Sequence, residues 1–293
     1  MDESYVIATA STSDLTREYL NEHNIPFISY MYILDGKAYE DDCLESTRQE
    51  IYKGMREGKI LSTSAINEYT YLEFFKGLLE KGKNVIFLDM SKELSSSYVS
   101  ANNAAQEARE TFPDCKLEIV DTCCVSGGLG MLVEEAVTLH ENGSSFEEVL
   151  EWIENNKLKI AHRFTVDDLN WLKRGGRVSN ASALVGTLLS IKPVLYVPDD
   201  GSLTVASKVR GRKTALNSII ESIKNELIDS EDSKVRILHA DCLEDAQYVK
   251  DSILQNFTKV KDVEISSLGV VIGAHCGPGL FTIFYMAKSR EAK

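Results

Sequence analysis

Short apolar runs alternate with segments of helical periodicity through the first half of the chain. Runs of four apolar residues lie at 5–8 and 85–88, a shorter apolar segment lies at 117–120, and apolar positions recur every three or four residues in the segments between them. This alternation is typical of βαβ units, in which helices join parallel strands. We therefore predict an α/β domain over residues 1–157, with a mainly parallel sheet and flanking helices.

The helical segments of this half have recognisable ends. Ser145 and Glu148 have the spacing of a capping box at the start of a helix. Ile25-Pro26-Phe27-Ile28 predicts an edge strand, because proline cannot donate to a central ladder. The periodicity predicts helices near 14–21, 44–55, 72–79, 98–108, 128–140 and 145–153.

The second half has a different pattern. Apolar residues alternate with polar ones over 158–164, which predicts a strand with one solvated face. Pro198-Asp199-Asp200-Gly201 predicts a hairpin turn between strands at 194–197 and 203–205. Helices near 216–227 and 246–257 and strands near 235–238, 263–265 and 280–285 complete a mixed sheet with helices. The polar stretch at 154–157 sets the expected boundary, so the second domain is 158–293.

Charge and hydropathy exclude several classes of partner. The 293 residues carry a formal net charge of -13, which repels nucleic acid and anionic membranes, so we expect neither as a partner. No apolar run is long enough to span a membrane, and Met1-Asp2-Glu3-Ser4 is acidic where a signal peptide would be basic. We therefore predict a cytoplasmic protein without stable membrane insertion.

The cysteines indicate neither disulfides nor a metal. The six cysteines include no C-x-x-C pair, and the adjacent Cys123 and Cys124 are poorly placed to bond to each other. No spacing of cysteines and histidines matches a known metal site. We predict reduced cysteines, no metal and no cofactor.

The segment Trp171-Leu172-Lys173-Arg174-Gly175-Gly176-Arg177-Val178 is the strongest candidate for chemistry. It places two guanidinium groups three residues apart across two glycines. Guanidinium binds carboxylate or phosphate with paired donors, and glycine allows close backbone approach. The alternative interpretation is a solvated basic turn after a short helix.

Hydroxyl side chains follow several of the expected strands. They lie at Ser11-Thr12-Ser13-Asp14, Ser62-Thr63-Ser64, Ser95-Ser96-Ser97 and Asp121-Thr122. One such loop alone is an ordinary helix cap. Several of them at the carboxyl edge of one parallel sheet, beside helix N-termini, predict a site for a small anion.

His275 lies in the glycine-rich segment 273–279 before the last expected strand, where it can face a ligand. The chain has no G-x-S-x-G motif, no Walker A sequence and no G-x-G-x-x-G after a strand. We therefore do not expect it to bind ATP or NAD. Two other interpretations of these residues stay open: a Ser-His hydrolase that uses Ser95 with His275, and a small-anion sensor or regulatory domain.

Together these segments resemble the bacterial DegV family, whose members include the fatty-acid-binding (FakB-type) subunits of fatty acid kinase. The resemblance spans nearly the whole chain. The motifs that carry it are Ser11 to Leu15, Thr63-Ser64, Leu94 to Tyr98 with Ser100-Ala101, Val120-Asp121-Thr122, Leu172 to Val178, Ile191-Lys192-Pro193 and His275 to Gly279.

The resemblance implies a two-domain protein that is not itself an enzyme. It implies a long-chain fatty acid held between the domains, with its tail in an apolar tunnel. It also implies a carboxylate bound by Thr63, with its neighbour Ser64, and by Ser95, Arg174 and His275. A separate fatty acid kinase would then convert the bound acid to the acyl phosphate used in phospholipid synthesis.

Arg177 is expected to serve the kinase partner instead of the ligand. Gly175 and Gly176 form a flexible backbone that can direct the two arginine side chains differently. An acidic protein needs a local feature that docks its partner near the carboxylate, and arginine often dominates binding energy at contact centres. We therefore assign Arg177 to partner docking.

Overall fold

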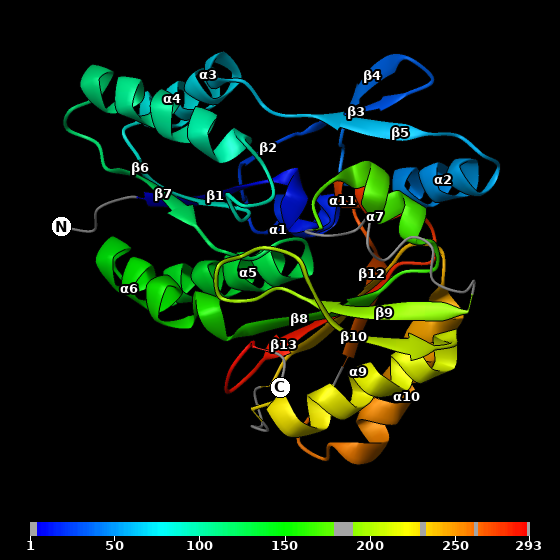
Figure 1. Ribbon diagram of the computed structural model, residues 1–293. Coiled ribbons are helices and arrows are strands. Elements are labelled where there is room, and N and C mark those ends of the chain that lie inside the picture. Colours follow the sequence, from blue (N-terminus) through cyan, green and yellow to red (C-terminus); the bar gives the residue numbers. More distant parts are fainter. Residues whose placement is uncertain (1–4, 179–189, 229–232, 261–262, 292–293) are drawn as a thin grey trace.

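The computed structural model describes residues 5–178, 190–228, 233–260 and 263–291. The expected N-terminal segment Met1 to Ser4 lies outside these ranges. Figure 1 shows the larger sheet of each half of the chain, with α5 (Gly127–Glu141) between these two sheets. Helix α5 contacts β1 and β6 of the first sheet and β8, β11 and β13 of the second.

The N-terminal sheet is parallel, as predicted. Its strands are β1 (Tyr5–Ala10), β2 (Phe27–Ile28), β6 (Asn84–Asp89) and β7 (Leu117–Asp121), in the order β2-β1-β6-β7. Strand β2 is at the edge, so the prediction from Pro26 is confirmed. The helices of this half are α1 (Arg17–Glu22), α2 (Glu45–Arg56), α3 (Glu68–Leu79), α4 (Ser97–Thr111), α5 and α6 (Phe146–Asn156).

Two helix starts test the capping arguments. The box predicted before α6 is present, because Ser145 and Glu148 each bond to the other's backbone N–H. Helix α1 begins later than expected. Ser11–Ser13 instead form a 3-10 turn, η1, and Asp14 adopts a left-handed conformation with φ 55°.

A small antiparallel sheet was not predicted from the sequence. It consists of β3 (Met31–Leu34), β4 (Lys37–Glu40) and β5 (Leu61–Ser64), in the order β4-β3-β5. The sequence feature that indicates this sheet is Asp35-Gly36, a dipeptide typical of the turn in a tight hairpin. Both residues have positive φ. As a result, Thr63 lies on an antiparallel strand opposite Tyr32, and not at the carboxyl end of a parallel strand.

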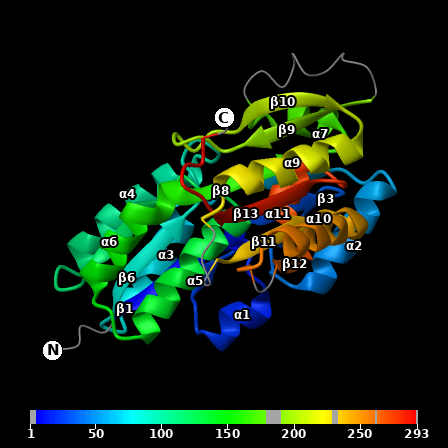
Figure 2. The ribbon, with the colours of Figure 1, turned by 90° about the horizontal axis from the view of Figure 1, so that it is seen from below.

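The C-terminal sheet is mixed, as predicted. Its strands are β8 (Ile160–Thr165), β9 (Ile191–Tyr196), β10 (Thr204–Arg210), β11 (Val235–His239), β12 (Val263–Ser267) and β13 (Phe281–Met286), in the order β10-β9-β8-β13-β11-β12. Among these pairs, only β11 and β12 run parallel. Helices α9 (Arg212–Glu226) and α10 (Leu243–Asn256) lie across one face, as Figure 2 shows.

The expected solvated face of β8 was wrong. All six of its residues are buried. The strand lies between β9 and β13, and helices α5 and α9 contact it. Residues 158 and 159 belong to a 3-10 turn, η2 (Lys157–Lys159), so the alternation in the sequence began before the strand.

The two halves share an apolar core. One buried cluster extends from the first sheet through α5 to one face of the C-terminal sheet, and a second lies under α9 and α10. The boundary between 157 and 158 therefore stays a prediction.

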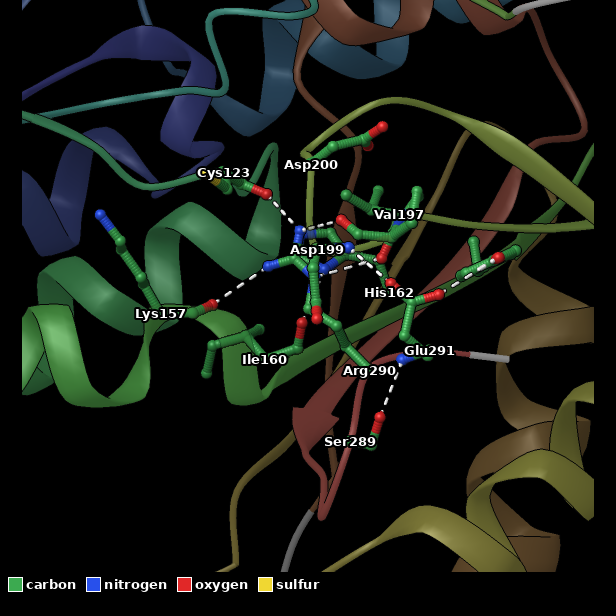
Figure 3. A network of polar contacts seen from close by, with 12 residues as sticks. Cys123, Lys157, Ile160, His162, Val197, Asp199, Asp200, Ser289, Arg290 and Glu291 are labelled. Atoms are coloured by element: carbon green, nitrogen blue, oxygen red, sulfur yellow. Dashed lines mark hydrogen bonds and ion pairs between the residues drawn. The ribbon is translucent and has the colours of Figure 1, made fainter. Parts of the chain in front are cut away.

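The segment after β13 is held by Arg290, whose side chain is completely buried. Its guanidinium donates to the carbonyls of Cys123, Lys157 and Val197 (Figure 3). These carbonyls belong to three separate segments, so one residue near the C-terminus ties together loops of both halves. Val197 and the ring of His162, which bonds to the N–H of Val125, also line the cavity described next.

Candidate functional site

A cavity lies between the two halves of the chain. About 870 Å³ of space free of atoms lies within it, including the open part at its mouth. Tyr30 and Met90 line it from the N-terminal half, and Phe164 and Leu280 line it from the C-terminal half.

Most of the cavity wall is apolar and buried. The apolar lining residues include Met90, Leu94, Val125, Phe164, Val197, Leu203, Leu268, Val271, Ile272, Leu280 and Phe284. Such a wall stabilises a hydrocarbon ligand by removing it from water and offers few hydrogen bonds.

Polar side chains gather where the cavity meets solvent. Thr63, Ser64, Ser95, Arg177 and His275 all line it, and each is at least partly exposed. The cavity is therefore amphipathic, with a polar opening and a mainly apolar interior, to which Ser126, His162 and Thr282 add buried polar groups. The structure brings together four of the five residues expected to bind an anion.

His275 pairs with Thr63 across the opening. Its Nε2 lies 2.9 Å from the Thr63 hydroxyl. Burial, followed by the charge of Arg177, lowers the pKa of His275 to about 4. The imidazole is therefore neutral at pH 7, and one of its nitrogens is a donor while the other is an acceptor.

Close packing of two short helices fixes this histidine. His275 lies in the last turn of α11 (Val270–Cys276), and not in a glycine-rich turn as expected. Helix α7 (Leu169–Gly175) packs against α11. A Cβ on Gly175 would lie 2.8 Å from the backbone oxygen of His275, and one on Gly277 would lie 2.3 Å from the Trp171 ring. Both glycines are therefore required for this contact.

Ser95 is held by neighbours on two elements. Its Oγ accepts from the N–H of Ser97 at 3.2 Å and lies 3.4 Å from the hydroxyl of Tyr30. The Ser97 hydroxyl in turn accepts from the N–H of Ile66 at 2.9 Å. This bond ties the segment after Thr63 to the start of α4, so the two hydroxyl loops are held side by side.

The positions of the two arginines do not support the expected division of roles. Arg177 lines the cavity, and its guanidinium donates to the carbonyls of Gly175 at 2.7 Å and Leu94 at 3.4 Å. Arg174 does not line it, and its guanidinium lies 4.0 Å from the centre of the Trp171 ring. The reason is local: Gly176 ends α7 in a left-handed turn with φ 68°, which reverses the chain between the two arginines.

Two of the hydroxyl-rich loops are structural. Ser11, Thr12 and Ser13 are completely buried. Asp14 accepts a hydrogen bond from Ser126 at 2.5 Å, and Arg48 donates to its backbone carbonyl. The second of these loops is Asp121-Thr122. It is also held by internal hydrogen bonds, because the Thr122 hydroxyl donates to the carbonyl of Asp89.

The hydrolase alternative lacks support in this geometry. Among the hydrogen bonds of the described residues, Nε2 of His275 pairs with Thr63 and none joins His275 to Ser95. No carboxylate bonds to His275 among these residues, so the group that would orient a catalytic histidine is missing from its surroundings.

The described ranges contain no group of three or more His, Cys, Asp or Glu side chains placed to hold a metal ion. Within the same ranges, no helix combines the length and hydropathy needed to cross a membrane.

The fold and the cavity define a two-part α/β protein with an amphipathic site between its parts. The family model described as "Uncharacterised protein, DegV family" matches residues 4–288. A DegV domain-containing protein of Clostridium perfringens is 36% identical over 290 residues, which cover 99% of each chain. One from Lactococcus lactis is 35% identical and covers 98% of this chain and 100% of its own. The chain belongs to the DegV family.

Solved structures agree with this assignment. A DegV family protein from Thermus thermophilus, described by its fatty acid binding, has a TM-score of 0.87 at 31% identity, covering 97% of this chain and 99% of that one. A fatty acid binding DegV family protein from Streptococcus agalactiae has a TM-score of 0.84 at 27% identity, covering 98% and 99%.

Proposed function

We propose that this protein binds one long-chain fatty acid, with the tail in the apolar interior and the carboxylate at the polar opening. The observation that carries the proposal is the amphipathic cavity itself, in which Thr63, Ser95 and His275 meet at the mouth of an apolar space. The fatty acid binding named for the structural relatives supports it.

The energetics favour such a ligand. Each buried CH₂ group contributes about 0.8 kcal/mol, so an acyl chain of ordinary length binds tightly through the wall alone. A carboxylate that lost its water without a partner would cost several kcal/mol. Donors at the opening remove that cost and fix which end of the acid faces solvent.

Four residues supply these donors in the proposal. The hydroxyls of Thr63 and Ser95 and the neutral imidazole of His275 form hydrogen bonds, and Arg177 supplies the positive charge. Ser64 lies at the rim beside them. Arg177 replaces Arg174 in this set because it is the arginine that lines the cavity.

We further propose that the protein is a carrier subunit of the FakB type. It would present the bound carboxylate to a separate cytoplasmic fatty acid kinase, and the acyl phosphate would enter phospholipid synthesis. The carboxylate lies at the opening, where a second protein can reach it. Arg174 is exposed in the last turn of α7, so we assign the docking role to Arg174, while Arg177 can contact both ligand and partner.

Native mass spectrometry of the protein purified from bacteria tests the binding proposal. We expect a mass increase of one fatty acid per chain, lost after delipidation and restored by added oleic acid. A protein that has no added mass, and takes up no oleic acid after delipidation, would refute it.

A further inference from the structure

The interior of the cavity holds a threonine whose hydroxyl is not used by the described part of the protein. Thr282 lines the cavity and is 4% exposed. Its backbone lies in the sheet, opposite Leu238 on one side and Phe164 on the other. Among the hydrogen bonds of the described residues, none includes the Thr282 hydroxyl. A buried hydroxyl without a partner is unfavourable, and valine, which is also β-branched, would fill the strand position without that cost.

The alternation of β13 directs this side chain into the cavity. Thr282 and Phe284 line the cavity, whereas Phe281 and Ile283 belong to the core under α9 and α10. Successive residues of a strand point to opposite faces of the sheet, so Thr282 points away from that core. The polar residues of the opening are partly exposed, and Thr282 is buried, so its hydroxyl faces the interior and not the opening.

The two other buried polar side chains of the interior already have partners. His162 accepts from the N–H of Val125 at 3.2 Å through Nε2, and its Nδ1 lies 3.0 Å from the carbonyl oxygen of Ile160. A nitrogen that accepts carries no proton, so the ring proton is on Nδ1 and both nitrogens are used. The Ser126 hydroxyl donates to a buried carboxyl group at 2.5 Å. Thr282 therefore has the interior hydroxyl whose proton can still bond a ligand.

The charges around the cavity restrict which ligand group can meet this hydroxyl. The described residues that line the cavity include one arginine and no lysine, and this arginine, Arg177, lies at the opening. The carboxyl group bonded by Ser126 belongs to Asp14, which is itself buried. A second carboxylate in the interior would lack a cation and would lie near that carboxyl group, so it is unfavourable. A neutral hydroxyl suits Thr282, because each of the two groups can both donate and accept.

Close packing holds this part of the wall in place. A Cβ on Gly127 would lie 2.7 Å from the Phe284 ring, and one on Gly128 would lie 2.2 Å from Nε2 of His162. The first turn of α5 therefore rests directly on the cavity-facing residues of β8 and β13. The side chain of Thr282 is itself stiff, because a β-branched residue has few rotamers. Its hydroxyl therefore meets one short stretch of an acyl chain and not the whole length.

We propose that Thr282 selects fatty acids that carry a hydroxyl group along the chain, by forming a hydrogen bond with that hydroxyl in the interior of the cavity. The inference rests on the proposed function, because it takes the carboxylate to be bound at the opening, and it names the class of acid as hydroxy fatty acids. An unsubstituted tail covers the Thr282 hydroxyl with CH₂ groups and leaves it without a partner. A hydroxylated tail at the matching position gives each hydroxyl a partner in the other.

The test compares stearic acid with a series of hydroxystearic acids, whose single hydroxyl lies at successive carbons from the middle of the chain to its end. Titration calorimetry measures the Kd of each acid for the delipidated full chain. Isomers with the hydroxyl at a narrow set of positions should bind at least as tightly as stearic acid. The other isomers should bind about tenfold or more weakly, because each buries a hydroxyl without a partner.

Thr282→Val removes the hydroxyl and keeps the branched shape of the side chain. It should raise the Kd of the preferred isomers about tenfold and keep that of stearic acid within about twofold, or lower it. Thr282→Ser should restore the preference. Thr165→Val is the matched control, because the Thr165 hydroxyl on β8 is also buried without a partner, and Thr165 lies opposite Phe281 on the other face of the sheet. This control should leave the preference unchanged.

The outcomes separate this inference from the proposed function. Tight binding of stearic acid, with every hydroxylated isomer about tenfold weaker or more, would overturn the inference and leave fatty acid binding intact. A preference that survives in Thr282→Val, or that Thr165→Val removes equally, would overturn it as well. Failure of the wild type to bind any of these acids would refute the proposed function itself. The wild-type series decides the question even if a variant fails to fold.

Discussion

Arg177→Ala should weaken fatty acid binding, whereas Arg174→Ala should not. Both side chains are exposed and lie three residues apart, on either side of Gly175 and Gly176, so the pair is a matched comparison. Arg177 lines the cavity and Arg174 stacks on Trp171 outside it. A hydrogen bond to a charged group contributes about 1.5–3 kcal/mol, and solvent screening reduces exposed pairs to about 1 kcal/mol or less. We therefore expect about 1.4 kcal/mol, a tenfold rise in Kd.

Displacement of a fluorescent fatty acid from delipidated protein measures this difference. The effect of Arg177→Ala should shrink as salt screens the charge, and Arg174→Ala should stay within about twofold of wild type. Because the charge of Arg177 lowers the pKa of His275, Arg177→Ala should also raise that pKa above about 4, as followed by NMR of the imidazole. A larger loss of affinity in Arg174→Ala than in Arg177→Ala would refute the reasoning and restore Arg174 to the carboxylate.

Three further changes test other parts of the site. Thr63→Val removes the hydroxyl that pairs with His275 and should raise Kd about fivefold, as measured by the same displacement assay; unchanged affinity would exclude Thr63 from the headgroup site. Val271→Trp adds bulk to the apolar wall and should abolish binding of eighteen-carbon acids before that of shorter acids, which a chain-length series would show; equal loss at all lengths would contradict an extended tail. Asp89 has a folded pKa of about 7 against an ordinary value of 3.8, so its contribution to stability is present below pH 3.8 and is lost as the pH rises through 7. Asp89→Asn should therefore raise the free energy of unfolding at pH 8 by up to about 4 kcal/mol, and by less at pH 5; chemical denaturation at both pH values checks this, and an equal effect at both would contradict it.

Much of the fold was predictable because local patterns determine it. The buried run of β6, the proline of β2 and the capping box of α6 each follow from residues adjacent in sequence. The β3–β4 hairpin is also a local feature, because Asp35-Gly36 is typical of a tight turn. The burial of β8 depends on its neighbours β9 and β13, which are distant in sequence, so its apparent alternation was misleading.

The sequence predicts most of the residues that form the site, but it does not predict how they are arranged. Thr63, Ser64, Ser95 and His275 were expected together, and they line one cavity. Which arginine joins them depends on a single left-handed glycine, Gly176, whose conformation the sequence allows but does not specify. The contact between Tyr30 and Ser95 could not be predicted, because the two residues are distant in sequence.

A crystal structure of the protein bound to oleic acid tests the central claim most directly. The account predicts one acyl chain along the apolar wall, with its carboxylate within hydrogen-bond distance of Thr63, Ser95 and His275 and beside the guanidinium of Arg177. A carboxylate at the opposite end of the cavity, or a lipid bound elsewhere with the cavity filled by water, would contradict it.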